Sequence, residues 1–177
     1  MKLKKEKIKV LLVDDEEEFA ETLSERLQMR DVDSDTAFDG EQAIESVSEQ
    51  EPDVLVLDLK MPGIHGLEVL RWIKQFHPKI QVIILTGHGT ERDEEKARQL
   101  GAFDYLKKPV ETESLVKKIK SAYKANFEDS MAAAAFAESG EFETATDILR
   151  ESAQANLGNM LADHKEKDRK RNKQNDE

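Results

Sequence analysis

Acidic side chains stand directly after several short apolar runs in this sequence. The run Val54–Leu57 breaks off at Asp58, and an earlier run is followed by Asp14 and Asp15. A later run ends at Thr86. Carboxylates that converge repel one another and need a cation, and a set of oxygen ligands without His or Cys suits Mg²⁺. The first chemistry to consider is therefore a magnesium site with a hydroxyl beside it.

A lysine pair supplies the positive charge that such a site could use. Lys107 and Lys108 follow the last of these apolar runs, directly before Pro109. A lysine and a hydroxyl beside a metal ion suit a phosphoryl group, whose transfer depends mainly on positioning and charge neutralisation. Because a carboxylate can attack phosphorus and form an aspartyl-phosphate, Asp58 is a candidate nucleophile.

These side chains can meet only if the apolar runs are strands of one parallel sheet. Short apolar runs alternate with longer amphipathic stretches, which is typical of βα units. The carboxyl ends of parallel strands share one edge, where ligands bind. The predicted strands are Lys9–Val13, Asp33–Phe38, Val54–Leu57, Gln81–Leu85 and Ala102–Leu106. The predicted helices are Glu17–Gln28, Gly40–Ser48, Gly66–Phe76, Glu91–Leu100 and Glu111–Tyr123. We therefore expect an α/β fold with a doubly wound five-stranded parallel sheet.

Composition excludes several classes of protein. A chain of 177 residues suits one full-size domain and a small appendage. The net charge of -11 disfavours direct binding to nucleic-acid phosphates, and the absence of cysteine excludes disulfides and thiolate metal sites. No apolar stretch approaches the roughly 18 residues of a membrane span. The histidines lack metal-ligand spacing and are expected at the surface: His65, His77, His88 and His164.

The C-terminal part of the chain differs in character from the rest. We expect a first domain at residues 1–124, a helical hairpin at 125–162 and a charged tail at 163–177. The hairpin pattern has two helical segments joined at Ser139–Gly140. The tail holds eleven charged residues and is predicted to be disordered. Residues 125–177 carry seven basic and twelve acidic side chains and show no DNA-recognition helix, which favours output through protein contacts or dimerisation.

Four motifs, taken together, resemble one known family. They are "VLLVDDEEE", "VLVLDLKMPGIHGLEVLRWIK", "VIILTGHGT" and "GAFDYLKKPV", in this order. With them, the stretch from about Ile8 to Lys124, roughly two-thirds of the chain, resembles the receiver domain of two-component response regulators. The resemblance implies a flavodoxin-like receiver fold and signalling by phosphorylation. A cytoplasmic location is also expected, and the absence of cysteine is compatible with a reducing cytosol.

The resemblance also implies a role for each acidic residue at the strand ends. Asp58 would be the phosphoacceptor. Asp15 would bind Mg²⁺ directly, while Asp14 would act mainly through a bound water. The backbone carbonyl of Lys60 would complete the metal site. A structural alternative for Asp14 and Asp15 is that they only cap the helix that follows.

Three further residues receive roles from the family. Thr86 and Lys108 would contact the phosphoryl oxygens, and the bond between Lys108 and Pro109 would be a cis peptide. Tyr105 stands at the position of a switch aromatic. A phosphoryl oxygen bonded to Thr86 would vacate the space into which Tyr105 turns. The alternative is that Tyr105 simply packs in the core.

The expected partners are a histidine kinase or phosphotransfer protein, and either a second copy of the chain or a downstream protein. Beyond phosphorylation and dephosphorylation of its own aspartate, no enzymatic activity is expected. One alternative is a scaffold that never becomes phosphorylated. Another is a Mg²⁺-dependent phosphatase of the haloacid dehalogenase type, but that chemistry needs an acidic side chain two positions after the nucleophile, where this sequence has Lys60.

Overall fold

The fold is an alternation of strands and helices along the chain. The structure is a computed structural model that describes the backbone of residues 6–136 and the side chains of residues 6–129. The strands are β1 Ile8–Val13, β2 Val32–Ala37, β3 Val54–Leu57, β4 Gln81–Thr86 and β5 Asp104–Lys107. The helices are α1 Glu17–Gln28, α2 Gly40–Glu49, α3 Gly66–Phe76, α4 Glu91–Gln99 and α5 Thr112–Phe136. None of the helices described is long and apolar enough to cross a membrane.

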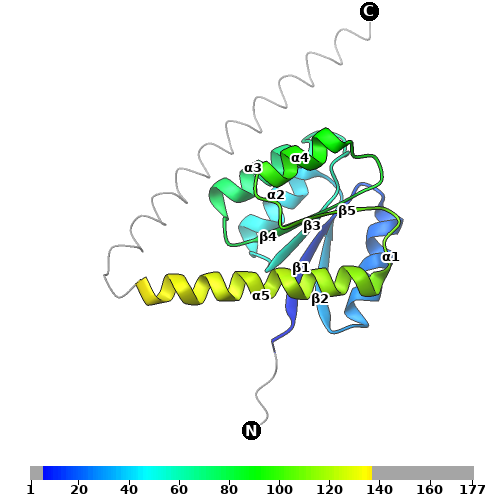
Figure 1. Ribbon diagram of the computed structural model, residues 1–177. Helices are drawn as coiled ribbons and strands as arrows, with labels where there is room; N and C mark the ends of the chain where they lie inside the picture. Colours follow the sequence, from blue (N-terminus) through cyan, green and yellow to red (C-terminus); the bar gives the residue numbers. More distant parts are fainter. Residues whose placement is uncertain (1–5, 137–177) are drawn as a thin grey trace, which may run out of the picture. The chain divides into compact units, whose positions relative to one another are not determined.

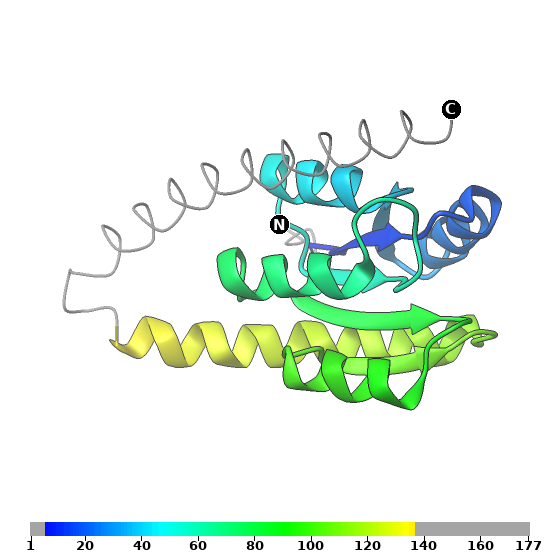
Figure 2. The same cartoon turned by 90° about the horizontal axis from the view of Figure 1, so that it is seen from above.

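The five strands form one parallel sheet in the order β2-β1-β3-β4-β5. Helices α2, α3 and α4 lie on one face of this sheet and α5 lies on the other (Figure 1). The strand arrows visible in Figure 2 point to the same end of the sheet. The predicted α/β class, the doubly wound topology and the convergence of the strand ends are therefore confirmed.

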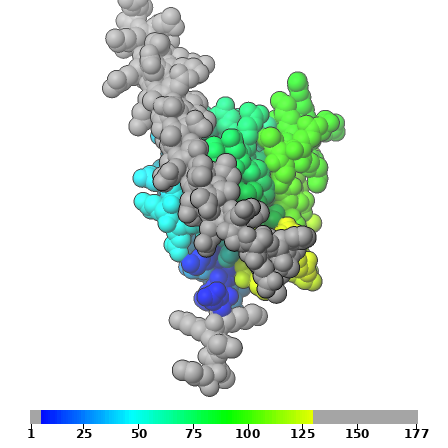
Figure 3. Space-filling view, turned by 90° about the vertical axis from the view of Figure 1, so that its left-hand side faces the viewer, coloured from blue at the N-terminus to red at the C-terminus, as the bar shows by residue number. Residues whose placement is uncertain are grey.

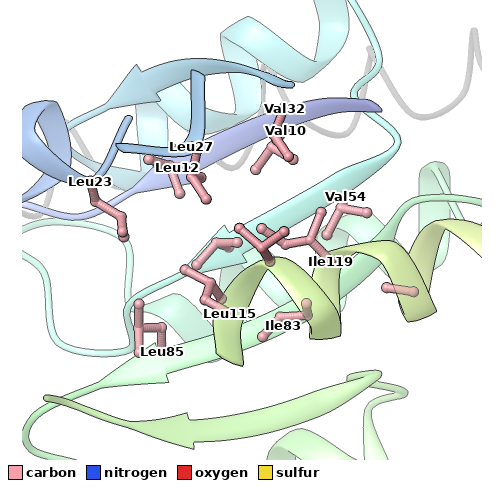
Figure 4. Packing of buried hydrophobic residues seen from close by; sticks show 13 residues of the cluster. Val10, Leu12, Leu23, Leu27, Val32, Val54, Ile83, Leu85, Leu115 and Ile119 are labelled. Atoms are coloured by element: carbon pink, nitrogen blue, oxygen red, sulfur yellow. The ribbon is translucent and has the colours of Figure 1, made fainter. Parts of the chain in front are cut away.

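The main core cluster lies between the sheet and helices α1 and α5. Leu115 and Ile119 of α5 are fully buried and face the strands, together with Leu23 and Leu27 of α1 (Figure 4). The central strand β3 is buried along its whole length. Because both of its faces are covered, its sequence is a continuous apolar run instead of an alternating one.

β2 is an edge strand, and its sequence alternates between buried and exposed residues. Val32 and Ser34 are buried, while Asp33 and Asp35 are exposed. The hydroxyl of Ser34 lies 2.7 Å from that of Ser24 in α1, so this buried polar group has a partner. The strand starts one residue earlier than its weaker apolar pattern predicts.

The end of α5 is the largest difference from the predicted elements. The helix was expected to stop at Tyr123, but it continues to Phe136. No glycine or proline occurs between Pro109 and Gly140, so the sequence contains no signal that would end the helix earlier. Residues 125–136 of the predicted hairpin therefore belong to α5. The rest of the hairpin and the charged tail lie outside the described residues.

The edge of the sheet opposite the carboxyl ends of the strands is seen in Figure 3. The start of β1 (blue), α2 (cyan) and the later turns of α5 (yellow) reach the surface there. Phe127, in these turns of α5, is 56% exposed.

The packing of α5 predicts a clear difference between its two faces. Ile119→Ala should lower the free energy of unfolding by about 2–5 kcal/mol, because it leaves a cavity against the sheet. Lys120→Ala, at the exposed neighbouring position, should change it by less than about 0.5 kcal/mol. Urea unfolding followed by circular dichroism measures both values. Similar losses in the two variants would contradict the packing described here.

Candidate functional site

Three carboxylates converge at the carboxyl end of the sheet. Asp14 and Asp15 follow β1, and Asp58 follows β3, the neighbouring strand. One carboxylate oxygen from each of the three residues lies within 4.8 Å of the others. Asp14 and Asp58 are buried, whereas Asp15 is exposed. The site therefore combines a buried pair of acids with one acid that is open to solvent.

Backbone hydrogen bonds fix the two buried acids. The amide of Asp58 donates to the carbonyl of Val13 at 2.9 Å, and that of Asp14 donates to the carbonyl of Ala37 at 3.0 Å. Each acid thus extends its strand by one residue. The Oδ1 atom of Asp58 also accepts a hydrogen bond of 2.7 Å from the amide of Leu59. Its Oδ2 atom is the oxygen that faces Lys108.

Lys108 supplies the cation that this acidic cluster needs. Its Nζ lies 2.6 Å from Oδ2 of Asp14, 3.0 Å from Oε1 of Glu16 and 3.7 Å from Oδ2 of Asp58. The same Nζ lies 4.3 Å from the centre of the Phe19 ring, within the range of a cation–π contact. The ammonium group is therefore surrounded by negative charge and by an aromatic face.

The backbone around Lys108 holds it at this edge. Its amide donates to the carbonyl of Thr86 at 2.9 Å, which joins the ends of β5 and β4. The peptide bond between Lys108 and Pro109 is cis, as the family resemblance predicts. Thr86 is 1% exposed, and its hydroxyl oxygen accepts a long bond of 3.4 Å from the amide of His88. Thr86 and Lys108 therefore stand together at the ends of their strands.

The two sides of the Asp14–Lys108 ion pair respond differently to burial. Burial raises the pKa of Asp14, and the bonds from Lys108 and from the amide of Glu16 offset this only in part. Burial alone would lower the pKa of Lys108, but its bonds to Asp14 and Glu16 outweigh that effect and raise it. Lys108 is thus firmly charged, while the ionised form of Asp14 is costly in the folded protein.

Tyr105 lies in β5, one strand away from Thr86, and is buried. Its hydroxyl is buried too and has no hydrogen-bond partner among the residues described. Burial raises its pKa, with further contributions from the charges of Asp93, Glu94 and Asp58. The ring is buried, and its hydroxyl end lies in the same space beside Gly89 as Cγ2 of Thr86. That a phosphoryl oxygen bonded to Thr86 would vacate the space into which Tyr105 turns stays a prediction.

The loop after Asp58 is held by the first residues of α3. A Cβ atom on Gly66 would lie 2.3 Å from the carbonyl oxygen of Asp58, so only glycine fits this contact. The ring of His65 caps α3 by accepting a hydrogen bond of 3.2 Å from the amide of Leu67. Lys60 is exposed in the same loop, and the role of its carbonyl as a metal ligand stays a prediction.

Two residues that contact Lys108 were not among the site residues predicted from the sequence. Glu16 and Phe19, both bound to Lys108, come from the turn and helix after Asp15, and their types alone do not identify them.

The histidines were expected at the surface, and the structure differs for one of those that it describes. His77 is buried, with its ring hydrogen-bonded to Glu51 and its centre 5.0 Å from that of the Trp72 ring. His88 is exposed as expected.

The contacts of Lys108 predict a destabilisation that depends on pH. Lys108→Met should lower the free energy of unfolding by about 1–3 kcal/mol at neutral pH, because Asp14 and Asp58 stay buried without their cation. Since the fold raises the pKa of Lys108, its contribution is complete at neutral pH and is lost only in the alkaline range. Acidification that protonates Asp14 should shrink the difference from the wild type.

Urea unfolding at several pH values measures this difference. Lys107→Met is the matched control, because Lys107 is the exposed last residue of β5 and directly precedes Lys108. It should remain close to the wild type at every pH. Equal losses in the two variants, or a loss in Lys108→Met that persists in acid, would show that the charge of Lys108 is not what stabilises the site.

Comparisons with known proteins agree with this geometry. A receiver domain protein from Clostridium thermocellum is 34% identical, with a TM-score of 0.63, over 66% of this chain and 94% of that one. The receiver domain of a LuxO repressor protein, described as putative, from Vibrio parahaemolyticus is 29% identical, with a TM-score of 0.67, over 72% of this chain and 98% of that one. The receiver domain of NtrX from Brucella abortus is 29% identical, with a TM-score of 0.62, over 65% of this chain and 98% of that one.

The family model of the response regulator receiver domain matches residues 10–120. This range begins within β1, ends within α5 and contains every residue of the site described above. Together with the parallel sheet and the acidic cluster at its carboxyl edge, the match shows that the chain belongs to the response regulator receiver domain family of two-component systems.

Proposed function

We propose that the chain is a phosphorylation switch in which Asp58 accepts a phosphoryl group from a histidine kinase or phosphotransfer protein. The observation that carries this proposal is the position of Asp58 between two further carboxylates and the ammonium group of Lys108, which is 3.7 Å from its Oδ2 atom. A nucleophile in this place is held by the backbone and faces a fixed positive charge.

Asp58 would react through its Oδ2 atom. Oδ1 is engaged by the amide of Leu59, so Oδ2 is the oxygen directed toward Lys108. It attacks phosphorus in line and forms the acyl phosphate as the bond between phosphorus and the donor's imidazole nitrogen breaks. The imidazole nitrogen keeps that electron pair, and the ring leaves as neutral imidazole because its other nitrogen carries a proton. Lys108 and the hydroxyl of Thr86 bind the phosphoryl oxygens.

The acidic cluster fits a magnesium ion. Asp14, Asp15 and Asp58 offer oxygens within 4.8 Å of one another, and a hard cation would balance the charge that burial makes costly at Asp14. The carbonyl of Lys60 would be a further ligand. When bound, the ion supplies charge neutralisation for the phosphoryl transfer.

Output would pass through Thr86 and Tyr105 to a surface that contacts another protein or a second copy of the chain. Thr86 binding a phosphoryl oxygen would shift the loop between β4 and α4, which also touches Tyr105. No reaction beyond the phosphorylation and dephosphorylation of Asp58 belongs to this function. The cytoplasmic location and the lack of direct DNA binding remain predictions from sequence.

The first test is the intact mass after incubation with Mg²⁺ and a small phosphodonor such as acetyl phosphate. One phosphoryl group should be added, and the addition should be lost in Asp58→Asn or when Mg²⁺ is omitted. Asp33→Asn, an exposed acid on β2, is the control and should react like the wild type. A chain that takes up no phosphoryl group from several donors would instead be a phosphorylation-independent scaffold.

The second test concerns the metal. Mg²⁺ at ten times its Kd should stabilise the wild type by about 1.4 kcal/mol, and this gain should disappear in Asp14→Asn. Because burial raises the pKa of Asp14, the gain should also fall as the pH drops toward that raised value. Thermal unfolding with Mg²⁺, against Na⁺ at matched ionic strength, measures both. A gain that persists in Asp14→Asn would place the ion elsewhere.

A further inference from the structure

The loop between β4 and α4 contains two glycines that differ in their surroundings. A Cβ atom built on Gly89 would lie 1.7 Å from the hydroxyl oxygen of Tyr105 and 2.8 Å from Cγ2 of Thr86. A Cβ atom on Gly87 would meet only the side chain of Lys108, at 3.8 Å, which is an ordinary contact. The phenol of Tyr105 thus occupies the space that any side chain at position 89 would need.

The requirement at Gly89 comes from space and not from backbone conformation. The glycines with a positive φ among the described residues are Gly63 and Gly101, and Gly89 is not one of them. The backbone at position 89 can therefore accept another residue, but the volume beside it cannot. An added methyl group can fit only if Tyr105 or Thr86 moves.

We infer that Gly89 is the positioning residue that lets Tyr105 lie buried beside Thr86. This inference rests on the proposed function, because Thr86 and Tyr105 matter for signalling only if Asp58 accepts a phosphoryl group. Neither Thr86 nor Tyr105 explains by itself why there is space for the buried ring. The room for the ring comes from the missing side chain at position 89.

No hydrogen bond to the hydroxyl of Tyr105 fixes the buried ring among the residues described. A hydroxyl that gives up water without gaining a partner weakens the buried state, which leaves the outward orientation accessible. A change of one methyl group at position 89 is therefore enough to shift the ring outward.

The arrangement couples the two switch residues. Thr86 and Tyr105 both border the volume beside Gly89, at 2.8 Å and 1.7 Å from the position of the added Cβ. A movement of Thr86 toward Asp58 would change the packing of the ring even though the ring is already buried. Gly89 keeps the two side chains in one shared space, so the position of each depends on the other.

The test uses the accessibility of Tyr105 in the full chain. The chain has two tyrosines, so Tyr123→Phe leaves Tyr105 as the single one. Nitration by tetranitromethane, followed by intact mass, should be slow in this background and at least about tenfold faster when Gly89→Ala is added. Gly87→Ala is the matched control and should nitrate at the background rate. Circular dichroism verifies that each variant is folded.

A folded Gly89→Ala variant with unchanged nitration would overturn the inference, as would equal acceleration by Gly87→Ala. If Gly89→Ala fails to fold, adding Tyr105→Ala should restore folding by removing the clash, and a lack of rescue would also overturn it. Nitration is measured without a phosphodonor, so its outcome is independent of whether Asp58 is phosphorylated.

A second readout links the ring to the switch. After incubation with Mg²⁺ and acetyl phosphate, the background chain should keep Tyr105 protected, whereas Gly89→Ala should stay reactive despite phosphorylation of Asp58. A purely structural role for Gly89 predicts equal nitration of folded variants in both conditions.

Discussion

The ammonium group of Lys108 is the constraint around which the site is arranged. Two neighbouring strands end in buried carboxylates, and their mutual repulsion would oppose the fold without a nearby cation. The Nζ atom of Lys108 lies 2.6 Å from Asp14 and 3.7 Å from Asp58 and supplies this positive charge. Lys108 directly follows β5, the strand at the edge of the sheet beyond β4. The hydrogen bond from its amide to Thr86 joins the charge balance to the end of β4. The same lysine therefore links the acidic cluster to the strand that carries the switch hydroxyl.

These charges would allow the site to bind both a cation, beside the carboxylates, and an anionic phosphoryl group, beside Lys108. The raised pKa of Asp14 shows that Lys108 does not fully compensate the buried charge. A divalent cation would complete that compensation, and a phosphoryl group on Asp58 would give Lys108 and Thr86 new partners.

Sequence alone predicts the sheet and the acidic cluster because both follow from strong local patterns. The buried run before Asp58 and the apolar run before Asp14 identify neighbouring strands, and parallel topology brings their ends together. Gly66 and Gly89 were not predicted, since the need for glycine there arises from atoms that are distant along the chain. The burial of His77 depends on Glu51 and Trp72 in the same way. The length of α5 was missed for another reason, because its pattern weakens after Tyr123 while nothing in the sequence stops the helix.

The central claim is that Asp58 alone carries the phosphoryl group. Borohydride reduces an acyl phosphate and turns the modified aspartate into homoserine, which peptide mass spectrometry can locate. After incubation with Mg²⁺ and a phosphodonor, the account predicts homoserine at position 58, with Asp14 and Asp15 unmodified. Homoserine at Asp14 or Asp15 in place of Asp58, or at no position at all, would contradict it.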